Sequence, residues 1–207
     1  DPRARTGCRS GCRSRRLRRI DEAERHSTAA LALLPARPTA PYEQYVRGNV
    51  VMRQGNLLKM RRRPEEALAL YEEAEALFAR LGALSSLSSV QQSTGHVLVQ
   101  LGRKREARRF YERALKIDRA RGATLFEING LISLVALDLE KPDALDLIQQ
   151  ADQMARRLGV ARMQLVVWRF LGRLHTNHGD LSAATACYDE ALALSLIHIS
   201  EPTRPSS

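Results

Sequence analysis

The chain has 207 residues, enough for one domain or one repeat array, and its 44% apolar but only 5% aromatic composition favours helices over strands. It contains no run of about eighteen apolar residues, so no membrane span is expected. Residues 1–19 hold eight Arg and one Asp and so carry +7 of the +10 net charge; the remaining 188 residues are not expected to bind nucleic acid specifically.

An arginine-rich segment can bind phosphate non-specifically, but these arginines have no aromatic residues among them. Residues 1–19 are therefore interpreted as a basic tail that is either disordered or not native. The chain starts without Met and without an apolar signal segment, so we expect an interior fragment of a longer protein. Residues 20–41 are expected to form a degenerate half-repeat, with a helix over 21–34, and a proline-broken loop. Three Cys residues are too few for a disulfide framework and fit a reducing cytoplasm.

A pattern of alanine, a bulky residue four positions later and alanine three positions further recurs along the rest of the chain. These offsets follow the helical period, so the three positions share one face, where the small alanines let a neighbouring helix approach closely. We therefore expect Ala107 and Ala114 to be buried. The copies lie 40, 37 and 40 residues apart and are Ala67/Tyr71/Ala74, Ala107/Tyr111/Ala114, Ala144/Ile148/Ala151 and Ala184/Tyr188/Ala191, with a weaker half-copy at Ala23/Ser27/Ala30.

Helices are expected to alternate with tight turns along this array. Glycines between the helices suit the left-handed position that ends a helix, and Pro64 and Pro142 suit the first position of the helix that follows. The expected helices of the array are 42–60, 64–81, 84–101, 104–120, 124–139, 142–158, 161–177 and 181–194. Paired in order, they give an array over 42–194 with units of about 42–82, 83–122, 123–159 and 160–194.

Residues 195–207 are out of register with the array and are broken by two prolines. Their sequence, "SLIHISEPTRPSS", resembles translated read-through of a sequencing adapter. We expect a disordered and non-native tail.

The recurring positions resemble the tetratricopeptide repeat, which combines bulky residues, Leu-Gly, and an alanine-aromatic-alanine helix. The last unit matches it best, with Trp168, Leu171, Gly172, Ala184 and Tyr188. The resemblance implies an all-α fold, a right-handed α-solenoid of stacked antiparallel helix pairs. Units near 40 residues, instead of the usual length of about 34, resemble helical-repeat regions of large bacterial transcriptional and signalling regulators.

Motifs for catalysis or for a cofactor are missing from the sequence. No phosphate-binding loop occurs, and Ser85, Ser86, Ser88 and Ser89 match no nucleophile motif. His175 and His178 lack the further ligands of a zinc motif and are expected to be structural. We therefore expect a protein that is not an enzyme and that holds no cofactor or metal.

The first helix of each unit is expected to line a concave partner groove. Asn, Gln and Arg side chains there could hydrogen-bond a peptide backbone or a carboxylate, or could be ordinary solvated residues. The predicted function is a protein- or peptide-binding scaffold, the sensor or interaction region of a larger cytoplasmic signalling or transcriptional regulator; the alternative is a small-ligand sensor. The candidate groove residues are Arg53, Asn56, Gln92, His96, Asn129, Ser133, Arg169, Arg173 and Asn177.

Overall fold

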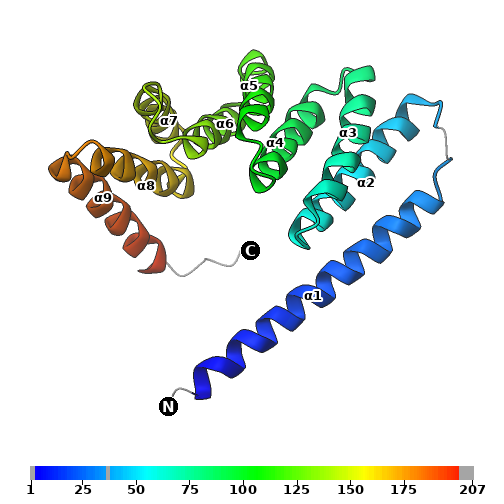
Figure 1. Ribbon diagram of the computed structural model, residues 1–207, viewed down its shortest axis with the longest axis horizontal. Coiled ribbons are helices and arrows are strands. Elements are labelled where there is room, and N and C mark those ends of the chain that lie inside the picture. Colours follow the sequence, from blue (N-terminus) through cyan, green and yellow to red (C-terminus); the bar gives the residue numbers. More distant parts are fainter. Residues whose placement is uncertain (1–2, 36–37, 201–207) are drawn as a thin grey trace. The chain divides into compact units, whose positions relative to one another are not determined.

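The structure is a computed structural model that describes residues 3–35 and 38–200, with side chains described over 18–35 and 38–195. Within these ranges the chain is all-α, with nine helices and no strand (Figure 1). The fold class is a right-handed α-solenoid of stacked antiparallel helix pairs. The helices are α1 (Arg3–Ala32), α2 (Pro41–Met60), α3 (Pro64–Arg80), α4 (Leu84–Gln100), α5 (Lys104–Ala120), α6 (Thr124–Leu137), α7 (Ala144–Leu158), α8 (Ala161–Asn177) and α9 (Leu181–Ser200).

Helices α2 to α8 begin and end within two residues of the ranges predicted from the sequence. Among the helices that the structure describes, none combines the length and the apolar character that a membrane crossing requires. Pro41 and Pro64 each stand at the start of a helix, where the missing amide hydrogen leaves no helical bond unmade.

The structure differs from the prediction at both ends of the chain. Helix α1 already begins at Arg3, so residues 3–19 are helical, and helix α9 continues to Ser200. No proline interrupts the run from Arg3 to Leu34, and Arg and Ala are strong helix formers, so an isolated basic composition does not prevent a helix here. Residues 1–2 and 201–207 lie outside the described residues. That either end is non-native stays a prediction.

The chain divides into two compact units, residues 1–107 and 108–207, with the boundary inside the first turns of α5. This division does not coincide with an end of any predicted repeat unit. The predicted repeat boundaries remain predictions, and each compact unit is described by itself.

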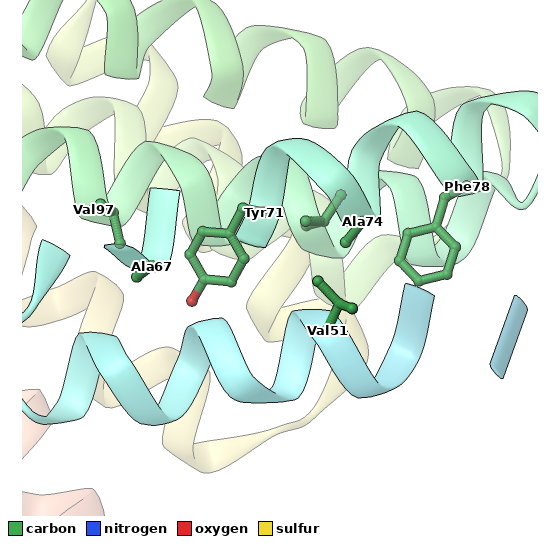
Figure 2. Packing of buried hydrophobic residues seen from close by; sticks show 7 residues of the cluster. Val51, Ala67, Tyr71, Ala74, Phe78 and Val97 are labelled. Carbon is green, nitrogen blue, oxygen red and sulfur yellow. The ribbon is translucent and has the colours of Figure 1, made fainter. Parts of the chain in front are cut away.

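The core of the first unit forms around α3, which packs against α2 on one side and α4 on the other. Tyr71, Phe78 and the two flanking alanines of the repeat pattern are completely buried, together with Val51 of α2 and Val97 of α4 (Figure 2). Two glycines of α2 make room for the rings: a Cβ atom at Gly55 would lie 2.6 Å from Tyr71, and one at Gly48 would lie 2.8 Å from Phe78. Small residues on α2 therefore set how closely α3 approaches it.

The core of the second unit is built by consecutive packing of α6, α7, α8 and α9. Ile148 and Leu174 are fully buried, and Trp168 is nearly so. The Trp168 indole Nε1–H donates to the Asp152 carboxylate at 2.8 Å, which joins α8 to α7. In the last helix the repeat tyrosine, Tyr188, is 41% exposed. Its position in the pattern matches Tyr71, but no following helix is described that could cover it.

The expected burial of the alanines is confirmed: Ala107 and Ala114 are both fully buried. The tyrosine between them, Tyr111, is 2% exposed. Offsets of four and seven residues thus mark the inner face of a helix in both compact units.

The turn that joins α2 to α3 contains a non-glycine residue in the left-handed region. Arg62 has φ 59°, while the corresponding turn before α5 has Gly102 at φ 75° and the turn before α9 has Gly179 at φ 79°. A side chain in this region brings its Cβ atom close to the following carbonyl oxygen, which costs about 1–2 kcal/mol. The backbone of the α2–α3 turn is therefore strained at Arg62, whereas the turns with glycine at this position are not.

Replacing Arg62 with glycine is expected to increase the free energy of unfolding by about 1 kcal/mol, because the strain is relieved at a small cost in unfolded-chain entropy. The change is measured by urea denaturation followed by circular dichroism. Arg62→Ala is the matched control, because it removes the same exposed guanidinium but keeps the Cβ atom. An equal gain in both variants would trace the effect to charge and contradict the strain.

Candidate functional site

In the first unit, α2 and α4 present polar side chains around the buried Tyr71 ring. The Tyr71 hydroxyl donates to Oδ1 of Asn56 at 2.8 Å. Burial raises the pKa of this hydroxyl to about 12, and a hydrogen bond with Ser93 of α4 acts in the opposite direction. The phenol therefore stays protonated and connects the predicted site residue Asn56 to both neighbouring helices. Because Oδ1 accepts this bond, the amide NH₂ of Asn56 remains as a donor.

The two predicted site residues of α4 differ in their surroundings. Gln92 is half-buried, whereas His96 is exposed. Desolvation of the ring, and secondarily the positive charge of Lys59 on α2, lower the pKa of the His96 imidazole. At neutral pH this histidine is therefore uncharged, and the pair His96 and Lys59 adds one positive charge to the α2/α4 face.

Arg53 lies one turn before Asn56 on α2, where a cleft of about 600 Å³ separates α2 from α1. The α2 wall consists of Val50, Arg53, Asn56 and Leu57. The α1 wall is formed by four residues that were not predicted as site residues, namely Ala23, His26, Ser27 and Ala30. Three of these four form the weak half-copy of the repeat pattern, so a signal for this wall was present in the sequence.

In the second unit, two predicted site residues of α8 share one aromatic ring. The guanidinium carbons of Arg169 and Arg173 each lie 5.7 Å from the centre of the Phe170 ring. Both arginines are exposed, whereas Phe170 is buried, with 8% of its surface exposed. Within the part of the chain whose side chains are described, neither guanidinium forms an ion pair with a carboxylate. The pair therefore presents two positive charges held on one ring.

The predicted site residues of α6 are less available. The Ser133 hydroxyl donates to the backbone carbonyl of Asn129 at 2.8 Å, and both side chains are half-buried. Helices α6 and α8 contact each other, but no bond joins Asn129 or Ser133 to Arg169 or Arg173 in the structure. That these four residues act together stays a prediction.

Asn177 lies at the C-terminal end of α8, away from the arginine pair by one to two helical turns. It lines a polar cavity of about 430 Å³ together with Leu139, Glu140 and His178. Its neighbour His175 lies 4.0 Å from Asp180, whose carboxylate accepts the backbone N–H of Ala183 at 3.0 Å. These contacts fix the α8–α9 turn.

Among the described side chains, the histidines and acidic residues do not assemble a metal site. Over residues 18–35 and 38–195, no group of three His, Cys, Asp or Glu side chains could hold a metal ion. Cys187 is a half-buried free thiol, and burial raises its pKa, with Asp152 as the next cause. It is therefore a poor nucleophile at neutral pH.

The comparisons with known proteins agree with the repeat interpretation. The tetratricopeptide repeat family model matches residues 48–120, which run from α2 to the end of α5. No curated protein matches the chain. The resemblance to tetratricopeptide-repeat proteins that the sequence indicates is confirmed.

Two solved structures share the fold over most of the chain. BtubC (BKLC) from P. vanneervenii superposes with a TM-score of 0.76 at 18% identity, covering 91% of this chain and 78% of that chain. A putative kinesin light chain from Podosopora anserina with nearly identical TPR-like repeats has a TM-score of 0.63 at 14% identity and covers 88% of each chain. At these identities the likeness concerns the fold alone.

Proposed function

We propose that this chain, which carries tetratricopeptide repeats over residues 48–120, binds an acidic protein or peptide partner through the first helices of its repeats. Stacked helix pairs of this kind are in general interaction scaffolds, because their first helices present an extended surface. The partner is anchored by Arg169 and Arg173 on α8. This scaffold is the sensor or interaction region of a larger cytoplasmic signalling or transcriptional regulator and has no catalytic role.

The arginine pair is the observation that carries this proposal. Surface arginines commonly pair with a nearby carboxylate of the same chain, as Arg103 does with Glu106 at 2.6 Å. Arg169 and Arg173 instead lie against Phe170, and neither forms an ion pair with a carboxylate in the described part of the chain. Stacking on the ring restricts both arginine side chains before the partner binds. Less conformational entropy is therefore lost when they bind a carboxylate of the partner.

The small-ligand alternative has support in the other compact unit. The cleft between α1 and α2 has a volume of about 600 Å³. Small-molecule pockets span roughly 300–1,000 Å³, so this cleft is of suitable size. It is lined by residues distant in sequence from the arginine pair, and the two sites can be tested separately.

The double variant Arg169→Ala/Arg173→Ala is expected to weaken the binding of an acidic partner peptide by tenfold or more, the effect of losing charged hydrogen bonds. Stability should change by less than about 1–2 kcal/mol, because only two exposed cation–π contacts are lost. The assay selects ligands from a random peptide library on the intact chain. It then compares the affinity of each variant for the selected peptides at fixed salt.

The matched control is Arg157→Ala/Arg162→Ala, which removes two exposed arginines near α8 and changes the net charge by the same amount. It should leave the affinity within about twofold, apart from general screening. Selection of peptides without acidic residues, or equal losses in the two double variants, would contradict the arginine anchor.

A further inference from the structure

The position that a tyrosine occupies in the repeat is occupied by a serine in α1. Tyr71 and Tyr111 stand between the two alanines of their helices and are almost fully buried. In α1 the same spacing, Ala23 and Ala30, encloses Ser27. Serine lacks the ring that fills the space against the neighbouring helices elsewhere, and a cleft of about 600 Å³ lies at this position between α1 and α2. The missing ring accounts for open space here.

We propose that this cleft binds a small carboxylic acid with an apolar, ring-containing body. This site lies on α1 and α2 and is independent of the proposed peptide anchor on α8. The ring takes the space that a repeat tyrosine would fill, and the carboxylate meets Arg53.

The walls of the cleft fit the apolar part of such a ligand. Ala23 and Ala30 on α1 face Val50 and Leu57 on α2, so side chains without hydrogen-bonding groups line both sides. The Ser27 hydroxyl donates to the backbone carbonyl of Ala23 at 2.7 Å, so its hydrogen is already bonded within α1. A hydrocarbon ring can therefore lie against these apolar residues and Ser27 without stranding the serine donor.

The cleft contains a positive charge and an amide donor, and these favour an anion. Arg53 contributes a guanidinium and Asn56 an amide NH₂ whose partner oxygen already accepts from Tyr71. His26 adds a ring nitrogen at the same cleft. Among the residues whose side chains are described, no carboxylate lines it. A ligand carboxylate would complement the guanidinium, whereas an amine would be repelled.

The acidic residues of α1 do not neutralise Arg53. Asp21 and Glu24 both pair with Arg61, the residue that follows the end of α2, and the Arg61–Glu24 pair has a distance of 2.6 Å. Those two ion pairs join α1 to the residue that caps the C-terminal end of α2. Among the described side chains, no carboxylate is paired with Arg53. The acids of α1 that form ion pairs are therefore bound to Arg61, and the positive charge of Arg53 remains in the cleft.

Three probes with the same naphthyl body test the proposal by calorimetric titration of the intact chain. They are naphthalene-1-acetate, 2-(1-naphthyl)ethanol and 2-(1-naphthyl)ethylamine. The acid is expected to bind at least tenfold more tightly than the alcohol, and the amine most weakly. No detectable binding of the acid at millimolar concentration, or equal affinity for the acid and the alcohol, would overturn the proposal.

Two variants locate the binding. Ser27→Tyr restores the repeat residue and is expected to abolish acid binding while the melting temperature stays equal or rises. Arg53→Gln is expected to weaken acid binding about tenfold and to leave alcohol binding unchanged. Arg80→Gln, which removes an exposed arginine of α3, is the charge control and should change nothing. Acid binding retained in Ser27→Tyr, or lost equally in Arg80→Gln, overturns the assignment.

The other candidate ligand of the cleft is a peptide, and the same calorimetric titration distinguishes it from a small acid. The acetylated tripeptide Gly-Gly-Phe with a free carboxylate offers a ring and an anion on a peptide backbone. It should bind no more tightly than naphthalene-1-acetate. Markedly tighter binding of the tripeptide would reassign the cleft to a peptide terminus and overturn the small-ligand proposal.

Discussion

Replacing Tyr71 with alanine is expected to lower the free energy of unfolding by about 3–5 kcal/mol, the range for removing a buried aromatic ring. The ring is completely buried between α2, α3 and α4, and its hydroxyl is hydrogen-bonded to Asn56. Its removal would leave a cavity against Gly55 that no neighbouring side chain can fill without moving a helix. Urea denaturation followed by circular dichroism measures the loss.

The equivalent tyrosine at the end of the chain provides the control. Tyr188 occupies the same register position but is 41% exposed, so Tyr188→Ala should cost about 1 kcal/mol or less. Tyr71→Phe separates the hydroxyl from the ring and should cost about 1 kcal/mol. Equal losses for Tyr71→Ala and Tyr188→Ala would mean that burial does not set the contribution of the repeat tyrosine.

The contrast between these tyrosines shows what a repeat pattern can predict. Residue spacing identifies the helix face that is buried, and Ala107 and Ala114 confirm it with complete burial. Spacing says nothing about whether a helix is present on each side of that face. Tyr71 and Tyr188 have the same neighbours in sequence register, and their exposure differs because α4 follows α3, whereas no described helix follows α9.

The helical start at Arg3 has a different physical origin. Basic composition and the lack of apolar residues favour disorder over residues 3–19, but the arginines there have a high helix propensity and no proline interrupts the segment. The proline-free stretch continues into the packed part of α1, where Ile20 is buried and Leu31 lies against the core of the first unit. A helix anchored in this way can extend outward along residues of good propensity.

The candidate site residues were only partly predictable. Arg169 and Arg173 are four residues apart, so their common side of α8 follows from the helical period. Their stacking on Phe170 depends on rotamers, which the sequence does not specify. Conversely, Arg53 was expected beside Asn56 in a groove of the first helices, and both in fact line the cleft with α1. These two residues line a cleft because α1, a half-copy of the repeat without its partner helix, lies beside α2.

Gly55→Ala is expected to destabilise the protein by about 1–3 kcal/mol, although alanine is the better helix former by about 1 kcal/mol. A Cβ atom at this position would lie 2.6 Å from Cε1 and 2.9 Å from Cδ1 of Tyr71. The ring is rigid and enclosed on all sides, so relief of the overlap requires α2 and α3 to move apart. That separation would loosen the packing of Val51 and Ala67 as well.

Gly172→Ala is the matched control, because a Cβ atom there would lie 2.7 Å from Cε1 and from Cζ of Tyr188, almost the same overlap. Tyr188 is partly exposed and can turn toward solvent, so the clash is relieved and the gain in helix propensity offsets the remainder. The expected change is within about 0.5 kcal/mol of zero.

In the first unit, Tyr71→Ala combined with Gly55→Ala should destabilise by less than the sum of the single changes, because the alanine methyl enters the space left by the ring. Additive losses there, or equal costs at the two glycines, would show that the tyrosine ring is not what requires glycine at this position.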